Sequence, residues 1–245
     1  VLCRPFDHGA AITTYSTTKY IGGHGTTIGG LIVDGGNFDW GKAGADRQPA
    51  MNTPDPCYGG VVWDEQVTKN MGLPFAYLLK LRTTLLRDLG GAMSPFNAWM
   101  FIQGLETLPL RMREHAKNAQ AVAEALAANK KVQSVTYPGL FEGAEKEKAD
   151  KYMTGGYGAL IGFELPGGKE AGSKFIDSLE LLYHVANIGD SRSLAIHPAT
   201  TTHSQLAPEE QLSAGVTPGY VRLSIGIENV EDIIADITQA IDKAS

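Results

Sequence analysis

Hydrophobic residues recur at helical spacing in two segments of the second half of the chain. The first segment predicts a helix from Leu108 to Ala128, with Thr107 as its N-cap and Pro109 tolerated in the first turn. Its apolar stripe consists of Leu108, Met112, Ala116, Ala119, Val122, Ala123 and Leu126. The second segment predicts a C-terminal helix that is capped by Asn229. Its buried stripe is expected at Val230, Ile233, Ile234, Ile237 and Ile241.

Short β-prone runs predict the strands. Residues 11–15 and 28–33 are expected to form two buried strands around a glycine-rich loop, and residues 158–165 and 181–186 two further strands. From Val221 to Ile227 apolar residues alternate with Arg222, Ser224 and Gly226. Because side chains alternate between the faces of a strand, Arg222 is predicted on the face opposite the apolar set.

The order of these elements predicts an α/β protein in two parts. Residues 1–107 are expected to be the end of an α/β domain, and residues 108–245 a smaller α+β domain. Residues 41–75 are rich in Gly, Pro and Asp and predict a long irregular connection, which is usually functional or disordered. The charged residues 142–151 predict a solvated helix or loop face.

Composition and charge narrow the functional classes. The chain has 245 residues, 43% of them hydrophobic and 20% charged, which is typical of a globular protein with a sizeable core. A net charge of −6 argues against nucleic acid or an anionic membrane as the main partner, and no apolar run is long enough to span a bilayer. With only Cys3 and Cys57, a disulfide framework is excluded and a reducing compartment is expected.

The strongest chemical signal is the segment Ser16-Thr17-Thr18-Lys19, which precedes the glycine-rich run Gly22-Gly23-His24-Gly25. A phosphorylated aldehyde cofactor needs an amine for its carbonyl carbon and hydroxyl or backbone donors for its phosphate. Ser16, Thr18 and Lys19 supply both kinds of group within one short segment. Spacing alone also allows an ordinary surface lysine beside a flexible loop.

The identity of the residues, and not only their spacing, takes the interpretation further, because the chain resembles the O-acetylhomoserine sulfhydrylases along its whole length. These enzymes belong to the pyridoxal-phosphate enzymes of cysteine and methionine metabolism. The blocks that carry the resemblance are LCRPFDHGA at 2–10, STTKYIGGHGTTIGG at 16–30, DGGNFDW at 34–40, SPFNAWMFIQGLETLPLRMREH at 94–115, NIGDSRSLAIHPATTTHSQL at 187–206 and VRLSIGIENVEDIIADI at 221–237.

The resemblance implies a fold-type I transferase that uses pyridoxal 5'-phosphate. Residues 1–107 would then be the C-terminal portion of the cofactor-binding domain, with residues 41–75 as a loop at the active-site entrance. Lys19 would bond the cofactor aldehyde, while Ser16 and Thr18 would hold its phosphate. Arg222 would hold the substrate carboxylate and Asn187 would contribute a polar contact to it, although a turn asparagine is nearly as common an interpretation. Arg192 matches a position that faces the distal part of the substrate in related enzymes.

The implied reaction converts O-acetylhomoserine and sulfide to homocysteine and acetate in methionine biosynthesis, in a cytoplasmic homotetramer. Two alternatives stay open. One is a cystathionine γ-synthase or γ-lyase of the same family, which the GHGTTIGG turn and the long segment after Trp40 disfavour. The other is a non-catalytic module that acts only as part of an assembly.

The chain begins at Val1 and resembles only the C-terminal part of the family. The aspartate that pairs with the pyridine nitrogen, the aromatic residue on the cofactor ring and the glycine-containing phosphate turn are not in this sequence. We therefore expect an N-terminal segment on another chain or missing, no turnover by the 245 residues alone, and exposed apolar surface around residues 1–35.

The histidines predict no metal site. His197 and His203 lie across a proline-containing loop and no cysteine or carboxylate completes a ligand set, which favours a structural role. His24 is close enough to Lys19 to influence the cofactor pocket, or equally to bond a local backbone group. A nucleophile elbow and a dinucleotide-binding fingerprint are both lacking.

Overall fold

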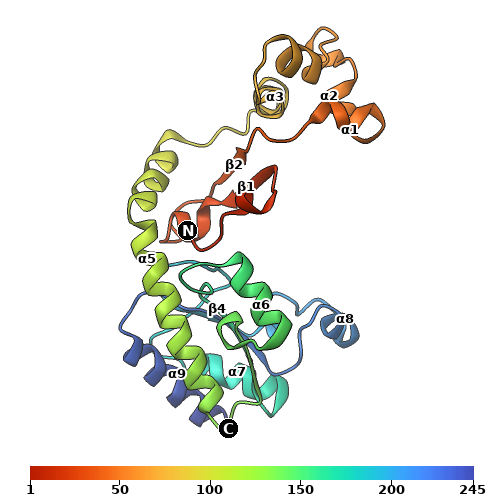
Figure 1. Ribbon diagram of the computed structural model, residues 1–245. Coiled ribbons are helices and arrows are strands. Elements are labelled where there is room, and N and C mark those ends of the chain that lie inside the picture. Colours follow the sequence, from red (N-terminus) through yellow and green to blue (C-terminus); the bar gives the residue numbers. More distant parts are fainter. The chain divides into compact units, whose positions relative to one another are not determined.

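A computed structural model describes all 245 residues, whose contacts group them into two compact units (Figure 1). The larger unit comprises residues 1–3, 16–28 and 99–245, and the smaller unit comprises residues 4–15 and 29–98. The mixture of helices and sheet confirms the predicted α/β class. The domain boundary proposed after residue 107 stays a proposal, and it lies inside a helix.

The larger unit contains a five-stranded sheet with the order β3-β4-β7-β6-β5. Its strands are β3 (Ser134–Thr136), β4 (Leu160–Glu164), β5 (Tyr183–His184), β6 (Leu194–Ile196) and β7 (Tyr220–Ser224). Neighbouring strands are antiparallel except for the parallel pair β5 and β6. The helices of this unit are most of α5 (Pro95–Ala128), α6 (Gly143–Tyr152), α7 (Gly168–Ser178), α8 (Pro208–Ser213) and α9 (Val230–Ala244). Short 3₁₀ turns lie at Pro138–Leu140 and Pro198–Thr200.

The core of this unit forms where β4 and β7 turn their apolar faces toward the helices. The register pairs Ile161 with Leu223 and Phe163 with Val221, so these four side chains share one face, and all are fully buried. Phe163 also meets Phe175 of α7 edge-to-face at 5.3 Å between ring centroids. The predicted alternation of β7 is thereby confirmed, and it leaves Arg222 half-buried on the other face of the strand.

Helix α5 begins at Pro95, so the prediction that it starts near Leu108 is wrong. Proline lacks the N–H group that an interior helical position donates, which costs about 3 kcal/mol and favours a first-turn position. Here the helix continues through Pro109. The predicted stripe is confirmed from Met112 to Leu126, whose members are buried, whereas Leu108 is partly buried.

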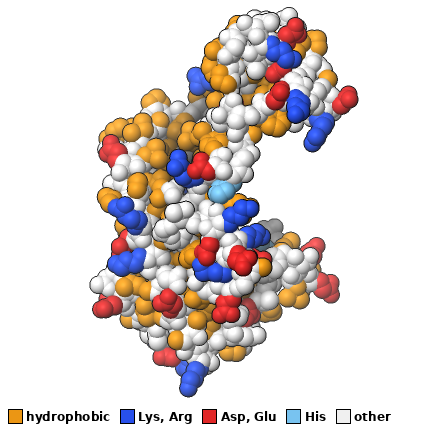
Figure 2. Space-filling view, viewed as in Figure 1, with side chains coloured by type: hydrophobic (Ala, Val, Ile, Leu, Met, Phe, Trp, Pro, Cys, Tyr) orange, Lys and Arg blue, Asp and Glu red, His pale blue; other side chains and the backbone are white.

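The N-terminal part of α5 carries a row of exposed apolar side chains, and Figure 2 shows hydrophobic atoms gathered over this part of the helix. The row consists of Phe96, Trp99, Ile102 and Leu105, each three residues after the one before it. Apolar residues therefore lie on the exposed side of this part of the helix as well as on its buried side, which holds Phe101 and Gly104. The usual one-sided pattern is absent, so the sequence does not mark the start of the helix. Val1, Tyr15, Ile28 and Leu31 are also exposed among residues 1–35.

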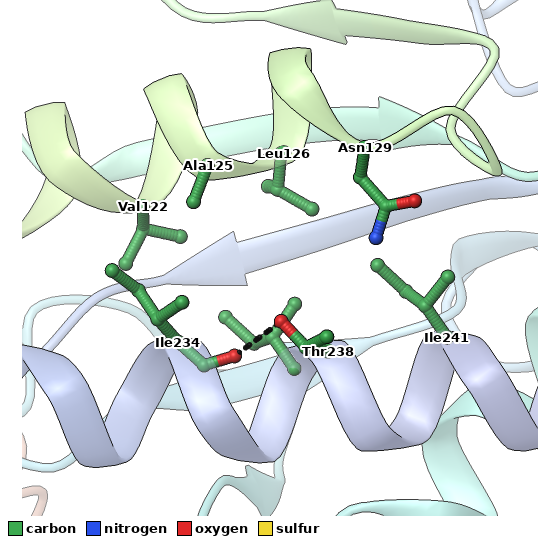
Figure 3. A pocket seen from close by; sticks show the side chains of 8 residues that line it. Val122, Ala125, Leu126, Asn129, Ile234, Thr238 and Ile241 are labelled. Atoms are coloured by element: carbon green, nitrogen blue, oxygen red, sulfur yellow. Dashed lines mark hydrogen bonds between the residues drawn. The ribbon is translucent and has the colours of Figure 1, made fainter.

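Helices α5 and α9 pack through aliphatic side chains, as Figure 3 shows for Val122 and Leu126 opposite Ile234 and Ile241. Thr238 lies in the same contact, and its hydroxyl donates to the carbonyl of Ile234 at 2.7 Å. The void between the two helices is only about 10 Å³, too small for a ligand. The contact is therefore structural. The predicted stripe of α9 is confirmed at Ile233, Ile237 and Ile241, which are buried, whereas Val230 and Ile234 are partly buried against the same core.

Asp236 joins α9 to the segment before β5. Its carboxylate accepts hydrogen bonds from the backbone N–H groups of Glu180 and Leu181 at 2.9 Å and of Leu182 at 3.0 Å, and from the Gln239 amide at 2.9 Å. Burial alone would raise the pKa of the Asp236 carboxyl, but these donors outweigh it and hold the pKa below its ordinary value.

We expect Asp236→Asn to lower the free energy of unfolding by about 1–3 kcal/mol at neutral pH, because an amide presents N–H groups toward backbone donors. A carboxyl group whose pKa is lowered in the folded state stabilises above its unfolded pKa of about 3.9, and this is lost as the pH falls through the folded value. Urea unfolding should therefore show the two proteins converging below about pH 4. The matched control is Asp242→Asn, an exposed α9 residue paired with Lys131 at 3.0 Å. Equal losses in both variants would contradict the assignment.

The smaller unit contains the two-stranded sheet of β1 (Ile12–Ser16, whose last residue belongs to the larger unit) and β2 (Gly30–Asp34). Its helices are α1 (Trp40–Arg47), α2 (Pro49–Asn52), α3 (Ala76–Lys80) and α4 (Arg87–Leu89), with π-helical segments at Asp64–Asn70 and Leu81–Leu86 and 3₁₀ turns at Pro5–His8 and Pro56–Tyr58. The prediction that β1 and β2 are buried is wrong, because only Thr13 among their residues is buried. Two strands alone cover little of each other's surface.

The prediction of an irregular connection at residues 41–75 is also wrong, because this stretch folds around a small core of its own. Met51, Trp63, Val67 and Ala76 are buried together. Asp55 accepts hydrogen bonds from the Lys80 ammonium at 2.5 Å and the Trp63 indole at 2.8 Å, and these donors lower the pKa of its carboxyl to about 2. None of the helices of either unit has the length and apolar character needed to cross a membrane.

Candidate functional site

Lys19 lies in a π-helical turn, Thr17–Ile21, rather than in the loop that the sequence predicts. Backbone hydrogen bonds of 2.8 Å close the turn, from Gly22 N–H to the Thr17 carbonyl and from Gly23 N–H to the Lys19 carbonyl. At Lys19 itself the backbone leaves helical geometry, with φ −87° and ψ −131°. The lysine is half-buried, and its Nζ donates to Oδ1 of Asn187.

Asn187 also brings Arg222 into this group. Nη2 of Arg222 donates to the backbone carbonyl of Asn187 at 3.3 Å, while the Asn187 side chain accepts from Lys19. The structure thus brings together three residues that the sequence predicted, from a turn, a loop and strand β7. Burial lowers the pKa of Arg222, yet a guanidinium remains charged at any physiological pH. It forms no ion pair with an acidic side chain, so its charge is available to a carboxylate ligand.

The hydroxyl groups before Lys19 differ in their surroundings. Ser16 is exposed and makes no capping hydrogen bond to the turn, and Thr18 is half-buried. The hydroxyl of Thr17 is buried and has no hydrogen-bond partner within the chain. A buried polar atom without a partner is uncommon and costly, so an acceptor group bound at this turn would relieve it. Thr17 is a candidate that the sequence analysis did not single out.

The glycine-rich run contacts the loop that carries Asn187. The backbone N–H and the hydroxyl of Ser191 donate to the Gly23 carbonyl at 2.8 and 2.9 Å. A Cβ on Gly25 would lie 3.0 Å from Oδ2 of Asp190, and a Cβ on Gly189 would lie 2.6 Å from the Tyr20 nitrogen. The glycines therefore allow close backbone contact on both sides and do not mark a flexible tether.

Asp190 and Arg192 form an ion pair in this loop. Nη2 of Arg192 lies 3.0 Å from Oδ2 of Asp190, and the Arg192 guanidinium also stacks over the Tyr183 ring at 4.9 Å. Burial would raise the pKa of the Asp190 carboxyl, but the hydrogen bonds from Arg192 hold it below its ordinary value. Because Asp190 balances the charge of Arg192, the role of Arg192 toward the distal part of a substrate stays a prediction.

The histidines have different environments. His197 is buried, with Nδ1 2.9 Å from the Thr200 hydroxyl and Nε2 2.8 Å from the Pro218 carbonyl. His203 pairs through Nδ1 with the Thr202 hydroxyl at 2.9 Å. His24 is exposed and lines a cavity of about 230 Å³ beside the lysine turn. The other residues that line this cavity are Gly22, Thr26, Thr27, Met100, Gln103, Gly104 and Thr107.

Sequence reasoning missed Arg111 and His115, two of the three buried polar residues of α5. Nδ1–H of His115 donates to the Ile225 carbonyl at 2.7 Å, and its ring meets Tyr20 edge-to-face at 5.3 Å. Burial lowers the pKa of His115. Arg111 donates to the Tyr20 carbonyl at 2.7 Å. Their positions on the predicted apolar face of the helix were the available signal, because a polar or charged side chain that is buried there needs hydrogen-bond partners.

Taken together, an amine and a guanidinium without an acidic partner contact one asparagine, and several hydroxyl groups lie beside the amine in the same short segment. An amine can bond a carbonyl carbon, hydroxyl groups can hold a phosphate, and a guanidinium can hold a carboxylate in two parallel hydrogen bonds. This donor set fits a phosphorylated aldehyde together with an α-amino acid.

Comparison with known proteins gives matches along nearly the whole chain. A model of the family described as Cys/Met metabolism PLP-dependent enzymes matches residues 1–242. O-acetyl-L-homoserine sulfhydrylase of Leptospira meyeri is 52% identical, over 98% of this chain and 54% of its own length. Homocysteine synthase of Schizosaccharomyces pombe is 49% identical, over 99% of this chain and 55% of its own length.

A solved structure agrees with these matches. The crystal structure of a Campylobacter jejuni protein assigned as an O-acetylhomoserine (thiol)-lyase is 40% identical and superposes with a TM-score of 0.88, covering 98% of this chain and 56% of that one. It contains N'-pyridoxyl-lysine-5'-monophosphate. The chain thus spans about half the length of the relatives it matches. These matches confirm the resemblance that the sequence blocks predict.

Proposed function

The chain belongs to the family of Cys/Met metabolism PLP-dependent enzymes, and from this premise we propose that it carries the catalytic lysine of an O-acetylhomoserine sulfhydrylase. The reaction would convert O-acetylhomoserine and sulfide to homocysteine and acetate, in methionine biosynthesis. The names of the relatives support this activity. The structural observation that carries the proposal is the contact of both Lys19 and Arg222 with Asn187.

The turn offers the groups that would hold the cofactor. Lys19 Nζ would bond the aldehyde carbon of pyridoxal 5'-phosphate, and the hydroxyl groups of Ser16 and Thr18 would donate to its phosphate. When bound, the cofactor supplies an electron sink that makes the α-proton of an amino acid removable. The unpartnered hydroxyl of Thr17 lies in the same turn and would also accept or donate there.

Three residues would then act on the substrate, namely Lys19, Asn187 and Arg222. Arg222 would hold the α-carboxylate, which fixes the amino-acid end of O-acetylhomoserine. Lys19 Nζ, freed by the incoming amino group, would take the α-proton and then move a proton at the β-carbon, so that acetate leaves from the γ-carbon and hydrosulfide adds there. Asn187 Oδ1 accepts from Nζ and so would orient the amine during these transfers.

The test compares two sulfur acceptors with the native protein, which means this chain together with the N-terminal segment expected above. The protein is supplied with O-acetylhomoserine and either sulfide or cysteine. We expect homocysteine from sulfide at a rate on the order of 1 s⁻¹ or more, and much slower formation of cystathionine from cysteine. Faster formation of cystathionine would favour a cystathionine γ-synthase, and cleavage of added cystathionine a γ-lyase. Absence of any bound cofactor would favour the non-catalytic module.

We propose further that the protein works in the cytoplasm as a homotetramer on small-molecule substrates. Two free and exposed cysteines, Cys3 and Cys57, support a reducing compartment. The exposed apolar row on α5 supports association with further protein, because contiguous apolar surface of this kind marks interaction sites. Light scattering of the purified native protein would check the assembly size.

Ser16→Ala should weaken retention of the cofactor by at least about tenfold, because a charge-assisted hydrogen bond to phosphate contributes roughly 1.5–3 kcal/mol. Equilibrium dialysis against pyridoxal 5'-phosphate measures this directly. Ser134→Ala is the matched control, since Ser134 is an exposed serine of strand β3. Unchanged retention in the Ser16 variant would remove this hydroxyl from the phosphate site.

A further inference from the structure

The turn that carries Lys19 ends with two carbonyl groups, and both accept hydrogen bonds from a single side chain of α5. Nη1 of Arg111 donates to the Tyr20 carbonyl at 2.7 Å, and Nη2 donates to the Ile21 carbonyl at 3.2 Å. The last carbonyls of any helical turn lack partners within the turn and carry partial negative charge. A guanidinium placed there acts as a side-chain cap of the turn.

The same guanidinium is held at its other side by its own helix. Nη2 donates to the Gly104 carbonyl at 2.7 Å, and Nε donates to the Thr107 hydroxyl at 3.2 Å. Arg111 is buried and forms no ion pair with a carboxylate. A buried charge without a counterion is costly, so the chain tolerates it only because these neutral oxygen atoms surround it.

Two glycines let the turn and the helix meet at this point. A Cβ on Gly104 would lie 2.2 Å from the Ile21 carbonyl oxygen, and a Cβ on Gly23 would lie 2.5 Å from Nη1 of Arg111. Gly23 also has φ +76°, which favours glycine. Its carbonyl accepts from Ser191, so the loop that carries Asn187 is fixed to the same turn.

We propose that Arg111 is a positioning residue that holds the backbone after Lys19 and thereby directs Nζ toward Asn187. The proposal rests on the function proposed above, because it assigns Arg111 a part in that chemistry. Tyr20 directly follows Lys19, so release of the Tyr20 carbonyl from Arg111 would free the backbone on the C-terminal side of the lysine. The position of the long, flexible lysine side chain is set by its backbone and by the hydrogen-bond partner of its Nζ.

The test compares Arg111→Lys and Arg111→Met with Arg113→Met in the native protein. Arg113 is an exposed arginine of the same helix with no hydrogen bond or ion pair, so it is the matched control. An ammonium keeps the positive charge of Arg111 but loses the planar fork that reaches several carbonyls at once. We therefore expect kcat to fall about 10- to 100-fold in both Arg111 variants, with KM for O-acetylhomoserine within about twofold because Arg222 is untouched.

Two further readouts do not depend on turnover. In protein freed of cofactor, hydrogen exchange at the amides of Gly22 and Gly23 should be at least about tenfold faster in the Arg111 variants. Attachment of added pyridoxal 5'-phosphate to Lys19, trapped by borohydride and mapped by mass spectrometry, should be slower by a similar factor. The Arg113 variant should match the wild type in both.

Gly104→Ala is the second variant, because it pushes the turn away from α5 without changing the guanidinium. It should reproduce the loss of kcat and the slower attachment, and it decides the matter if the Arg111 variants do not fold. A lower melting temperature of Arg111→Lys with unchanged kcat and attachment would overturn the proposal and leave Arg111 a purely structural residue. If the native protein does not use O-acetylhomoserine and sulfide, the proposed function fails, and exchange and attachment still decide the role of Arg111.

Discussion

Replacing Lys19 with alanine should abolish both turnover and the visible absorbance of the lysine-bound cofactor. The variant loses the only amine of the site, so it can neither bond the aldehyde nor carry the α- and β-protons. General acid–base groups contribute about 10²- to 10⁴-fold in rate, and we expect at least a 10³-fold loss of kcat. The cofactor should still be retained in part, because Ser16 and Thr18 would hold its phosphate. Absorbance spectra and steady-state kinetics of the native protein measure the two effects.

Lys130→Ala is the control for the Lys19 variant, because Lys130 is exposed and has no ion pair. A small primary amine added to the assay should restore part of the activity of Lys19→Ala, since it can enter the space that the side chain leaves. Rescue would show that the missing group is the amine and not the fold of the turn. If Lys19→Ala keeps its absorbance band and normal turnover, Lys19 is not the catalytic lysine.

The elements that the sequence predicts well are those with one apolar face and one polar face, whether the polar face is exposed, as in α9, or covered, as in β7. Helix α9 and strand β7 each present a strict apolar stripe to the same core, so the periodicity of the residues matches the structure. The start of α5 was missed because Trp99 and Ile102 are apolar but exposed, which breaks the relation between pattern and burial. Pro109 added to the error by resembling a first-turn proline.

The helices between residues 41 and 75 were missed for a different reason. They are short, and their stability comes from tertiary packing and from side-chain contacts distant in the sequence. Asp55, for example, accepts from Trp63 and from Lys80, which is 25 residues further along the chain. Such contacts leave little periodic signal in a stretch rich in glycine and proline.

The candidate site was accessible from the sequence only one residue at a time. The wording around Lys19 and around Arg222 pointed to each of them, but nothing local predicts that both contact Asn187. The contacts of Lys19 and Arg222 with Asn187 depend on tertiary packing, such as the close contact between the backbones of Gly189 and Tyr20. The same holds for Arg111. An arginine on an apolar helix face indicates that hydrogen-bond partners exist, but the sequence does not identify them.

Arg222→Lys should raise the KM for O-acetylhomoserine about 10- to 100-fold while leaving the cofactor absorbance unchanged. Lysine keeps the charge but cannot form the two parallel hydrogen bonds that a guanidinium makes with a carboxylate. Arg222 is suited to this role because its contact within the chain is the Asn187 carbonyl at 3.3 Å and no acidic side chain pairs with it. Arg113→Lys, on the exposed surface of α5, should leave KM unchanged.

A substrate analogue that lacks the carboxylate isolates the interaction that this prediction concerns. If Arg222 binds the carboxylate, wild type and Arg222→Lys should process the analogue at the same low kcat/KM, because the group that distinguishes them is absent. The coupling between the two changes then gives the free energy of the carboxylate contact, as in a double-mutant cycle. If Arg222→Lys lowers kcat/KM equally for O-acetylhomoserine and for the analogue, Arg222 does not bind the carboxylate. Its role would then be limited to the hydrogen bond with the Asn187 carbonyl.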